Sequence, residues 1–263
     1  MLKNKMKAIQ LSALALAVSG TMGATQAVAE MEMDVSASVS VSNLYLFRGV
    51  DLGNGSAMVS GDLIVSSQGF YGGVWAASGD AGLGSEYDLF VGFATEVEGV
   101  SVDISVVNYV YPSDDSSDQF GDFSDIYLNV GYGPFSVDYQ ANVADGSIAS
   151  GDVEGAKAAG VSGFQYIALN ASFKKYTATL GFADYNDYSS DKALTTDGSG
   201  VDVSSVGTDY THLDISYAYN DNLSFTISKI VDQDTIELTP AGTKFENHDE
   251  DPLVVISYTL PIE

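Results

Sequence analysis

The residues of this sequence that could act together in chemistry are one arginine, two histidines and a large excess of carboxylates. Arg48 is the only arginine, and it follows a segment in which serines alternate with apolar residues. An arginine that faces carboxylates across a narrow channel produces a transverse electric field, which selects solutes by charge and dipole. The alternative is a structural arginine that neutralises one buried acid and stabilises the wall around it.

The carboxylates that could oppose Arg48 occur at alternate positions of segments with a period of two. Residues i and i+2 of a strand lie on the same face, so these side chains share one polar face. We expect that face to line an aqueous lumen with an electronegative potential that favours cations. The predicted pore-lining residues are Arg48, Asp62, Glu86, Asp88, Asp103, Asp125, Asp138, His212 and Asp214.

The sequence predicts no enzyme, metal site or cofactor. The acidic runs 114–118 and 197–202 lack the spacing of a Ca²⁺ loop and its terminal glutamate, which leaves solvated surface charge or weak divalent binding. His212 and His248 lie on different segments and are too few for a histidine-rich Zn²⁺ site. An outer-membrane lipase would need a Ser–His pair on the lipid face. His212 falls on the polar face instead, and no Gly-x-Ser-x-Gly motif is present.

The elements that position these side chains are strands, because alternation of polar and apolar residues predicts a sheet with two different surroundings. Most of the segments are close to the length that a tilted strand needs to cross a bilayer. The predicted strands are Asp34–Arg48, Ala57–Ser66, Phe70–Ala77, Glu86–Glu96, Val100–Tyr111, Ser124–Tyr132, Phe135–Val143, Phe164–Phe173, Lys175–Tyr185, Asp209–Tyr219, Leu223–Val231 and Leu253–Leu260.

The connections between these strands alternate between short and long. The short ones are turns rich in Gly, Pro, Asn and polar residues: Ser67–Gly69, Val97–Gly99, Gly133–Pro134, Lys174 and Asn220–Asn222. The longer ones are Gly49–Ser56, Ser78–Ser85, Pro112–Phe123, Ala144–Gly163, Asn186–Thr208 and Asp232–Pro252. Short periplasmic turns and long extracellular loops are typical of bacterial outer-membrane barrels. We therefore predict an all-β fold, a transmembrane antiparallel up-and-down barrel of about twelve strands with long acidic loops.

Aromatic residues support a membrane location of this barrel. Several lie on the apolar face beside the short turns, where a periplasmic aromatic girdle is expected: Phe70, Tyr132, Phe135, Phe173, Tyr176 and Tyr219. The opposite girdle is less clear, with Phe47 as its best member. A periplasmic β-sandwich would show the same alternation. It is disfavoured because aromatics of a sandwich core would be spread along the strands.

Residues 1–29 are predicted to be a cleaved signal peptide. Lys3, Lys5 and Lys7 form a positive region, an apolar stretch follows, and Ala27-Val28-Ala29 is a small-x-small cleavage motif. Residues 30–263 then form a single barrel domain. Cleavage removes three lysines and no acid, which leaves seven basic and 36 acidic residues and changes the net charge from −26 to −29. Such a charge excludes nucleic acid as a partner, and the absence of cysteine excludes disulfides and thiolate chemistry.

Five short motifs resemble those of the TorF-like porin family of proteobacterial outer-membrane proteins. They are Tyr45-Leu-Phe-Arg48-Gly49, Gly69-Phe70-Tyr71-Gly72-Gly73-Val74-Trp75, Glu86-Tyr87-Asp88-Leu89, Asn108-Tyr109-Val110-Tyr111-Pro112 and Asp122-Phe123-Ser124-Asp125-Ile126-Tyr127. The resemblance covers most of the chain after the leader. It implies a barrel and a porin, with no substrate and no catalytic residues.

These observations together predict an outer-membrane, porin-like channel of a Gram-negative bacterium for passive diffusion of small, cationic or neutral solutes. The expected partners are outer-membrane lipid, lipopolysaccharide and the barrel-assembly machinery. The alternatives are a non-conducting structural or surface-interaction barrel and, third, a lipid-modifying enzyme. The sequence names no permeant.

Overall fold

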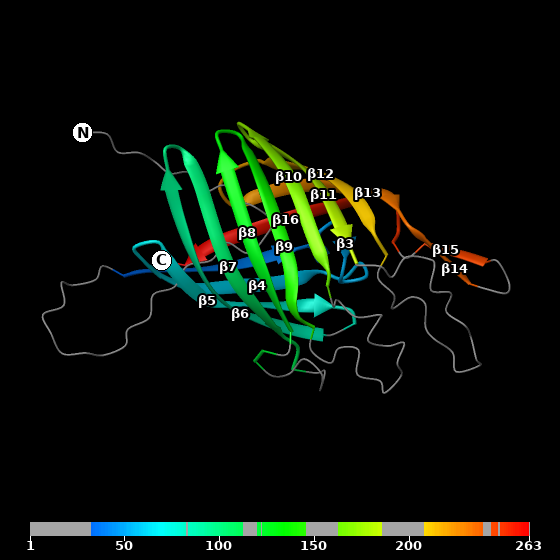
Figure 1. Ribbon diagram of the computed structural model, residues 1–263, viewed down its shortest axis with the longest axis horizontal. Coiled ribbons are helices and arrows are strands. Elements are labelled where there is room, and N and C mark those ends of the chain that lie inside the picture. Colours follow the sequence, from blue (N-terminus) through cyan, green and yellow to red (C-terminus); the bar gives the residue numbers. More distant parts are fainter. Residues whose placement is uncertain are drawn as a thin grey trace, which may run out of the picture.

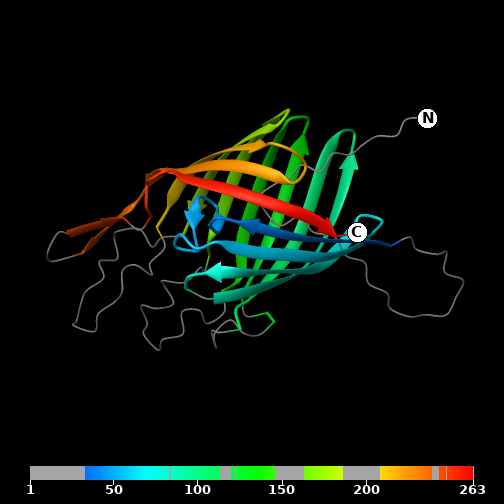
Figure 2. The same ribbon diagram turned by 180° about the vertical axis from the view of Figure 1, so that it is seen from behind.

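The computed structural model describes residues 33–82, 84–112, 120–121, 123–145, 163–185, 208–238, 243–246 and 248–262. Twelve antiparallel strands close into a barrel, which confirms the predicted fold class (Figures 1 and 2). They are β1 (Asp34–Ser42), β4 (Met58–Ser67), β5 (Phe70–Asp80), β6 (Gly84–Val97), β7 (Val100–Val110), β8 (Phe123–Tyr132), β9 (Phe135–Asp145), β10 (Gln165–Phe173), β11 (Tyr176–Asp184), β12 (Tyr210–Ala218), β13 (Leu223–Gln233) and β16 (Leu253–Ile262). The described residues contain no helix with the length and apolar character needed to cross a membrane.

Each barrel strand pairs with its neighbours in chain order, and β1 pairs with β16 to close the ring. Two hairpins interrupt this order. β2 (Leu46–Phe47) pairs with β3 (Val50–Asp51), and β14 (Thr235–Leu238) pairs with β15 (Thr243–Glu246). The β14–β15 hairpin projects beyond one end of the barrel in both views (Figures 1 and 2).

The two ends of the barrel differ in their connections. At one end, here the turn side, tight turns join β4 to β5, β6 to β7, β8 to β9, β10 to β11 and β12 to β13. Gln68 and Gly69 both have positive φ, and so do Glu98 and Gly99, as expected for the two-residue turns that fit twisted hairpins. The other end, here the loop side, has the inserted hairpins and the longer connections.

The outer surface of the barrel is apolar. Along β6 and β7 the outward positions are Leu89, Val91, Ile104 and Val106, all of which are exposed. The residues predicted for the aromatic girdle lie beside the tight turns and are 55–70% exposed: Phe70, Tyr132, Phe135, Phe173, Tyr176 and Tyr219. Large apolar side chains on the outside of a closed barrel require an apolar solvent. Their role at a lipid–water boundary stays a prediction.

Three predicted boundaries are wrong. β1 ends at Ser42 and not at Arg48. The Asn43 backbone still donates to Ile256 at 3.3 Å, but its side-chain amide takes the other bonds to the backbone of Val254 and Ile256. The expected loop Ser78–Ser85 is mostly strand, since β5 continues to Asp80 and β6 begins at Gly84. The expected loop Asp232–Pro252 contains the β14–β15 hairpin.

Some predictions fall outside the described residues. These are the signal peptide, the acidic runs 114–118 and 197–202, and nearly all of the loops Ala144–Gly163 and Asn186–Thr208.

Candidate functional site

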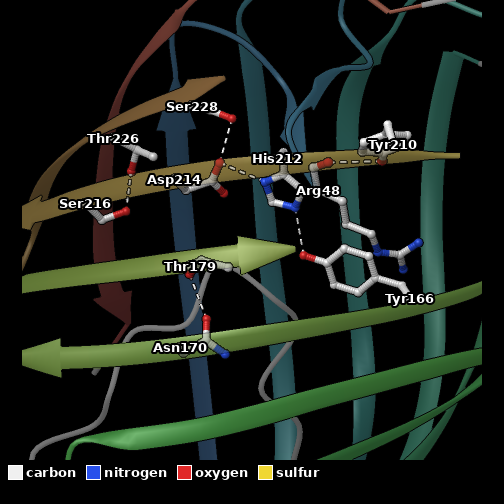
Figure 3. Close-up of polar contacts among 10 residues, drawn as sticks. All are labelled: Arg48, Tyr166, Asn170, Thr179, Tyr210, His212, Asp214, Ser216, Thr226 and Ser228. Atoms are coloured by element: carbon white, nitrogen blue, oxygen red, sulfur yellow. Dashed lines mark hydrogen bonds and ion pairs between the residues drawn. The ribbon is translucent and has the colours of Figure 1, made fainter. Parts of the chain in front are cut away.

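The candidate site occupies the loop-side half of the lumen, where a segment of the chain crosses the barrel. This segment, residues 43–57 between β1 and β4, is here named the inner hairpin. Its strands β2 and β3 meet at a tight turn formed by Arg48 and Gly49, which both have positive φ. The turn lies against strands β10 and β12, on a different part of the wall from β1 and β4, so the inner hairpin narrows the lumen (Figure 3).

The Arg48 side chain is held in an aromatic environment. Its guanidinium lies 4.1 Å from the ring centre of Phe47, 5.0 Å from that of Phe164 and 5.1 Å from that of Tyr166. One terminal nitrogen donates to the Tyr127 hydroxyl at 3.0 Å. Several cation–π contacts and one hydrogen bond fix the position of the charge, and none of the carboxylates that the structure describes is bonded to it. A hairpin tip, and not the first strand, therefore carries Arg48 to these inward side chains, and its role in lining a pore stays a prediction.

Gly49 explains why the turn can approach the wall so closely. A Cβ atom at this position would lie 2.6 Å from Cβ and Cγ of His212. The backbone also needs positive φ here, which glycine adopts without strain. The Tyr210 hydroxyl donates to the Arg48 carbonyl oxygen at 3.0 Å, and this bond ties the turn to β12.

His212 is the centre of a buried hydrogen-bond chain on β10, β12 and β13 (Figure 3). Its Nδ1 lies 2.9 Å from Asp214 Oδ1, and its Nε2 lies 2.8 Å from the Tyr166 hydroxyl. Ser228 donates to the same Asp214 oxygen at 2.6 Å. Gly181 makes room for this chain, because a Cβ there would lie 2.1 Å from Nε2 of His212. Both imidazole nitrogens thus have partners, and the serine hydroxyl bonds the carboxylate and not the imidazole.

His248 connects the loop-side rim of the barrel to the hydrogen-bond chain around His212. Its ring centre lies 4.5 Å from that of Tyr210, and its backbone exchanges hydrogen bonds with the side chain of Gln233. Burial lowers the pKa of the His248 imidazole, so the neutral form is favoured next to the Tyr210 ring.

A second cluster, formed by β6, the residue that follows β7 and the inner hairpin, is acidic. Glu86 is buried and accepts hydrogen bonds from the hydroxyls of Tyr45 at 2.6 Å and Tyr111 at 2.7 Å. Asp88 is on the same face of β6, two residues further along, and is equally buried. The hydrogen-bond chain around His212 and this acidic cluster thus belong to different strands of the barrel wall.

The remaining predicted carboxylates also point into the lumen and bond neutral side chains. Asp125 accepts from Gln140 and from Asn142, the latter at 2.9 Å. Asp138 accepts from Asn129 and, at 2.6 Å, from Asn170. Asp103 accepts from Tyr71, and Asp62 accepts from Ser38 at 2.9 Å.

The structure therefore brings the predicted residues together in two groups. Arg48, His212 and Asp214 form one group, and Glu86 and Asp88 are the centre of the other. Asp103, Asp138 and Asp62 lie apart from both groups, with partners of their own. Their role in lining a pore stays a proposal.

Sequence reasoning missed the tyrosines of the site. Tyr127, Tyr166 and Tyr210 hold Arg48, and Tyr45 and Tyr111 hold Glu86. The signal was present, since Tyr127 shares the polar face of Asp125 and Tyr210 that of His212. Phe47, expected on the outer girdle, lies in the inner hairpin against the guanidinium.

The arrangement concentrates fixed charge and hydrogen-bonding groups inside the barrel. Within the described ranges, no three His, Cys, Asp or Glu residues are placed to hold a metal ion. A fixed cation, a buried hydrogen-bond chain around His212 and several inward carboxylates can act electrostatically on a charged or polar molecule. The fold and the site define a closed β-barrel of the outer-membrane type whose polar lumen narrows on the loop side.

The chain belongs to the bacterial protein family of unknown function Gcw_chp, whose model matches residues 26–235. No curated protein matches the sequence significantly. The family match does not test the resemblance to TorF-like porins.

The barrel is similar to solved structures at low identity. Outer membrane phospholipase A from Escherichia coli is 11% identical, with 85% of this chain and 88% of that chain covered and a TM-score of 0.39. OprD from Pseudomonas aeruginosa is 10% identical, with 89% and 66% covered and a TM-score of 0.35. An outer membrane channel from Pseudomonas putida F1 is 9% identical, with 93% and 100% covered and a TM-score of 0.33. These proteins differ in activity, so the similarity assigns none to this chain.

Proposed function

We propose that this protein is a narrow diffusion channel of the Gram-negative outer membrane, a TorF-like porin that passes small cationic or neutral solutes. The observation that supports it most is the inner hairpin, whose Arg48 bonds Tyr127 of β8 in a barrel with many inward carboxylates. A structural arginine would need only one acid as a partner. The guanidinium instead bonds Tyr127 and aromatic rings, so its charge acts across the lumen.

The same proposal includes the location and the partners. The signal peptide directs the chain across the inner membrane, and the barrel-assembly machinery inserts it. The apolar outer face contacts lipid and lipopolysaccharide, because exposed valines, isoleucines and leucines form its surface. Carboxylates in the lumen raise the local cation concentration and repel anions, most strongly at low salt.

The test is the reversal potential of the refolded protein in a planar bilayer under a KCl gradient. We expect cation selectivity that decreases as ionic strength rises. Arg48→Ala should increase this selectivity, since it removes the fixed positive charge of the narrow region. Arg48→Lys keeps the charge and should stay near the wild type. Lys175→Ala, which removes a charge at the exposed turn beside β11, is the matched control and should change little.

The alternatives predict other results. An anion-selective wild type would refute the cation-preferring channel. A protein that inserts but does not conduct would favour the structural or surface-interaction barrel, in which the inner hairpin is a plug. Hydrolysis of phospholipid by the purified protein would be needed to favour a lipid-modifying enzyme.

A further inference from the structure

Glu86 and Asp88 form a pair of buried carboxylates to which no positive side chain among the described residues is bonded. They occupy positions i and i+2 on one face of β6, so their Cα atoms are about 7 Å apart. Their exposed fractions are 4% and 2%. The hydrogen bonds to Glu86 come from two phenols, those of Tyr45 and Tyr111. Two carboxylates so close in a buried setting repel each other, and phenols do not neutralise that charge.

One oxygen of this pair, Oδ1 of Asp88, is buried and accepts no hydrogen bond from any described residue. A buried carboxylate oxygen without a donor is costly. The pair therefore needs either a proton shared between its members or a bound cation that donates hydrogen bonds.

The surroundings select the kind of cation. The described residues provide no set of three ligands for a metal ion, so an all-protein metal cage is not formed. Aromatic rings stand beside the pair instead: Trp75 is paired in register with Asp88, and its ring centre is 6.2 Å from that of Tyr45. Carboxylate oxygens accept N–H donors, and aromatic faces attract organic cations. Arg48 does not fill this role, because Tyr127 and three rings hold it.

We propose that Glu86 and Asp88 form a binding site for a small primary ammonium cation, which donates hydrogen bonds to Asp88 Oδ1 and to a Glu86 oxygen. The site deepens the proposed channel function, since it names the class of solute, and it rests on that function for the route by which the cation enters.

Trp75 makes the site observable without conduction. It is the only tryptophan of the sequence, so the fluorescence of the refolded full-length protein in detergent reports on this region. We expect methylammonium chloride to change the emission with saturation. Sodium chloride at equal ionic strength controls for screening. Tetramethylammonium has the charge without N–H donors and should bind at least about tenfold more weakly, because hydrogen bonds to charged groups are lost.

The chain offers a matched control for the variants, since Trp75 is paired in register with two aspartates. Asp88 lies on one side on β6, and Asp62 lies on the other side on β4. Asp62 is half-buried and bonded by Ser38, whereas Asp88 Oδ1 has no donor. Asp88→Asn should abolish the saturable response, and Asp62→Asn should keep it. Heat-modifiable gel mobility shows whether each variant is folded, and Glu86→Gln serves as a second variant that should weaken binding.

The possible outcomes separate the site from the channel. The site would be overturned if methylammonium, tetramethylammonium and sodium gave the same fluorescence response, or if the response persisted in Asp88→Asn. A proton shared between Glu86 and Asp88 would then explain how the buried pair is stabilised. A saturable, variant-sensitive response in a protein that does not conduct would support the site and contradict the channel. Conductance without any saturable fluorescence response would support the channel and contradict the site.

Discussion

The two halves of the lumen are built on the same strands and yet differ in packing. The inward serines of β1 show this along a single strand, since Ser36 on the turn side is exposed and Ser42 on the loop side is buried. β6 repeats the gradient, with buried Glu86 and Asp88 at one end and exposed Glu96 at the other. Both halves share the same barrel geometry. The difference in exposure of their inward side chains therefore comes from side-chain volume and from the inner hairpin.

The two halves also differ in chemistry. On the turn side, pairs of small hydroxyls face each other: Ser216 with Thr226 at 2.8 Å, and Ser172 with Thr177 at 3.0 Å. On the loop side, inward residues are tyrosines, carboxylates, His212 and Arg48. Carboxylates also occur on the turn side, because Asp103 and Asp138 lie near the turn-side ends of β7 and β9. The fixed cation and the hydrogen-bond chain of His212 therefore distinguish the loop side, and we expect that side to be the narrower and more selective one.

The largest expected effect comes from removing the inner hairpin. Replacement of residues 44–55 by a short Asn-Gly turn takes away the segment that crosses the lumen, together with Arg48. Conductance should rise severalfold and selectivity for cations over anions should increase, because the fixed positive charge is lost. Single-channel recording measures both. An unchanged conductance would mean that the narrow part of the channel lies elsewhere, and the comparison of the two halves would fail.

A smaller effect is expected at the glycines of the inner hairpin. Gly49 and Gly55 both have positive φ, but a Cβ would collide with His212 at Gly49 and meet nothing within 4 Å at Gly55. Gly55→Ala should cost about 1 kcal/mol of folding stability through backbone strain alone. Gly49→Ala should cost more and should also raise conductance, since the turn must move away from β12. Urea unfolding in detergent and single-channel recording measure the two effects, and equal costs would contradict the packing of Gly49 on His212.

Much of the barrel could be predicted because its signal is local. Alternation with a period of two identifies strands and also their two faces, so Asp125 and Asp214 were placed inside and Val91 outside from the sequence alone. Gly and Asn in two-residue turns fixed the strand ends on the turn side. The predicted strand Val100–Tyr111 and the observed β7 (Val100–Val110) differ by one residue.

The inner hairpin could not be predicted in this way. Leu46 and Phe47 continue the strand-like composition of β1, and the departure at Asn43 depends on bonds to Val254 and Ile256, which are distant in sequence. The inward tyrosines were missed for a different reason. The alternation puts Tyr127 and Tyr210 on the polar face, but the prediction of lumen residues includes only charged side chains and His212. Tyrosines on the polar face of a strand should be included with them, because their rings and hydroxyls can pack inside the barrel.

The smallest effects on conductance are expected from two serines on neighbouring strands. Ser228 is fully buried on the loop side and donates to Asp214. Ser228→Ala should therefore lower the free energy of unfolding by about 1–3 kcal/mol, because the buried carboxylate loses a donor. Ser216, half-buried on the turn side, pairs with Thr226. Its change to alanine should cost less than about 1 kcal/mol, since water can replace the lost hydroxyl. Conductance and selectivity of Ser216→Ala should equal those of the wild type. Urea unfolding ranks the two variants, and a larger loss for Ser216→Ala would show that the turn-side hydroxyls, and not the loop-side network, hold the barrel wall together.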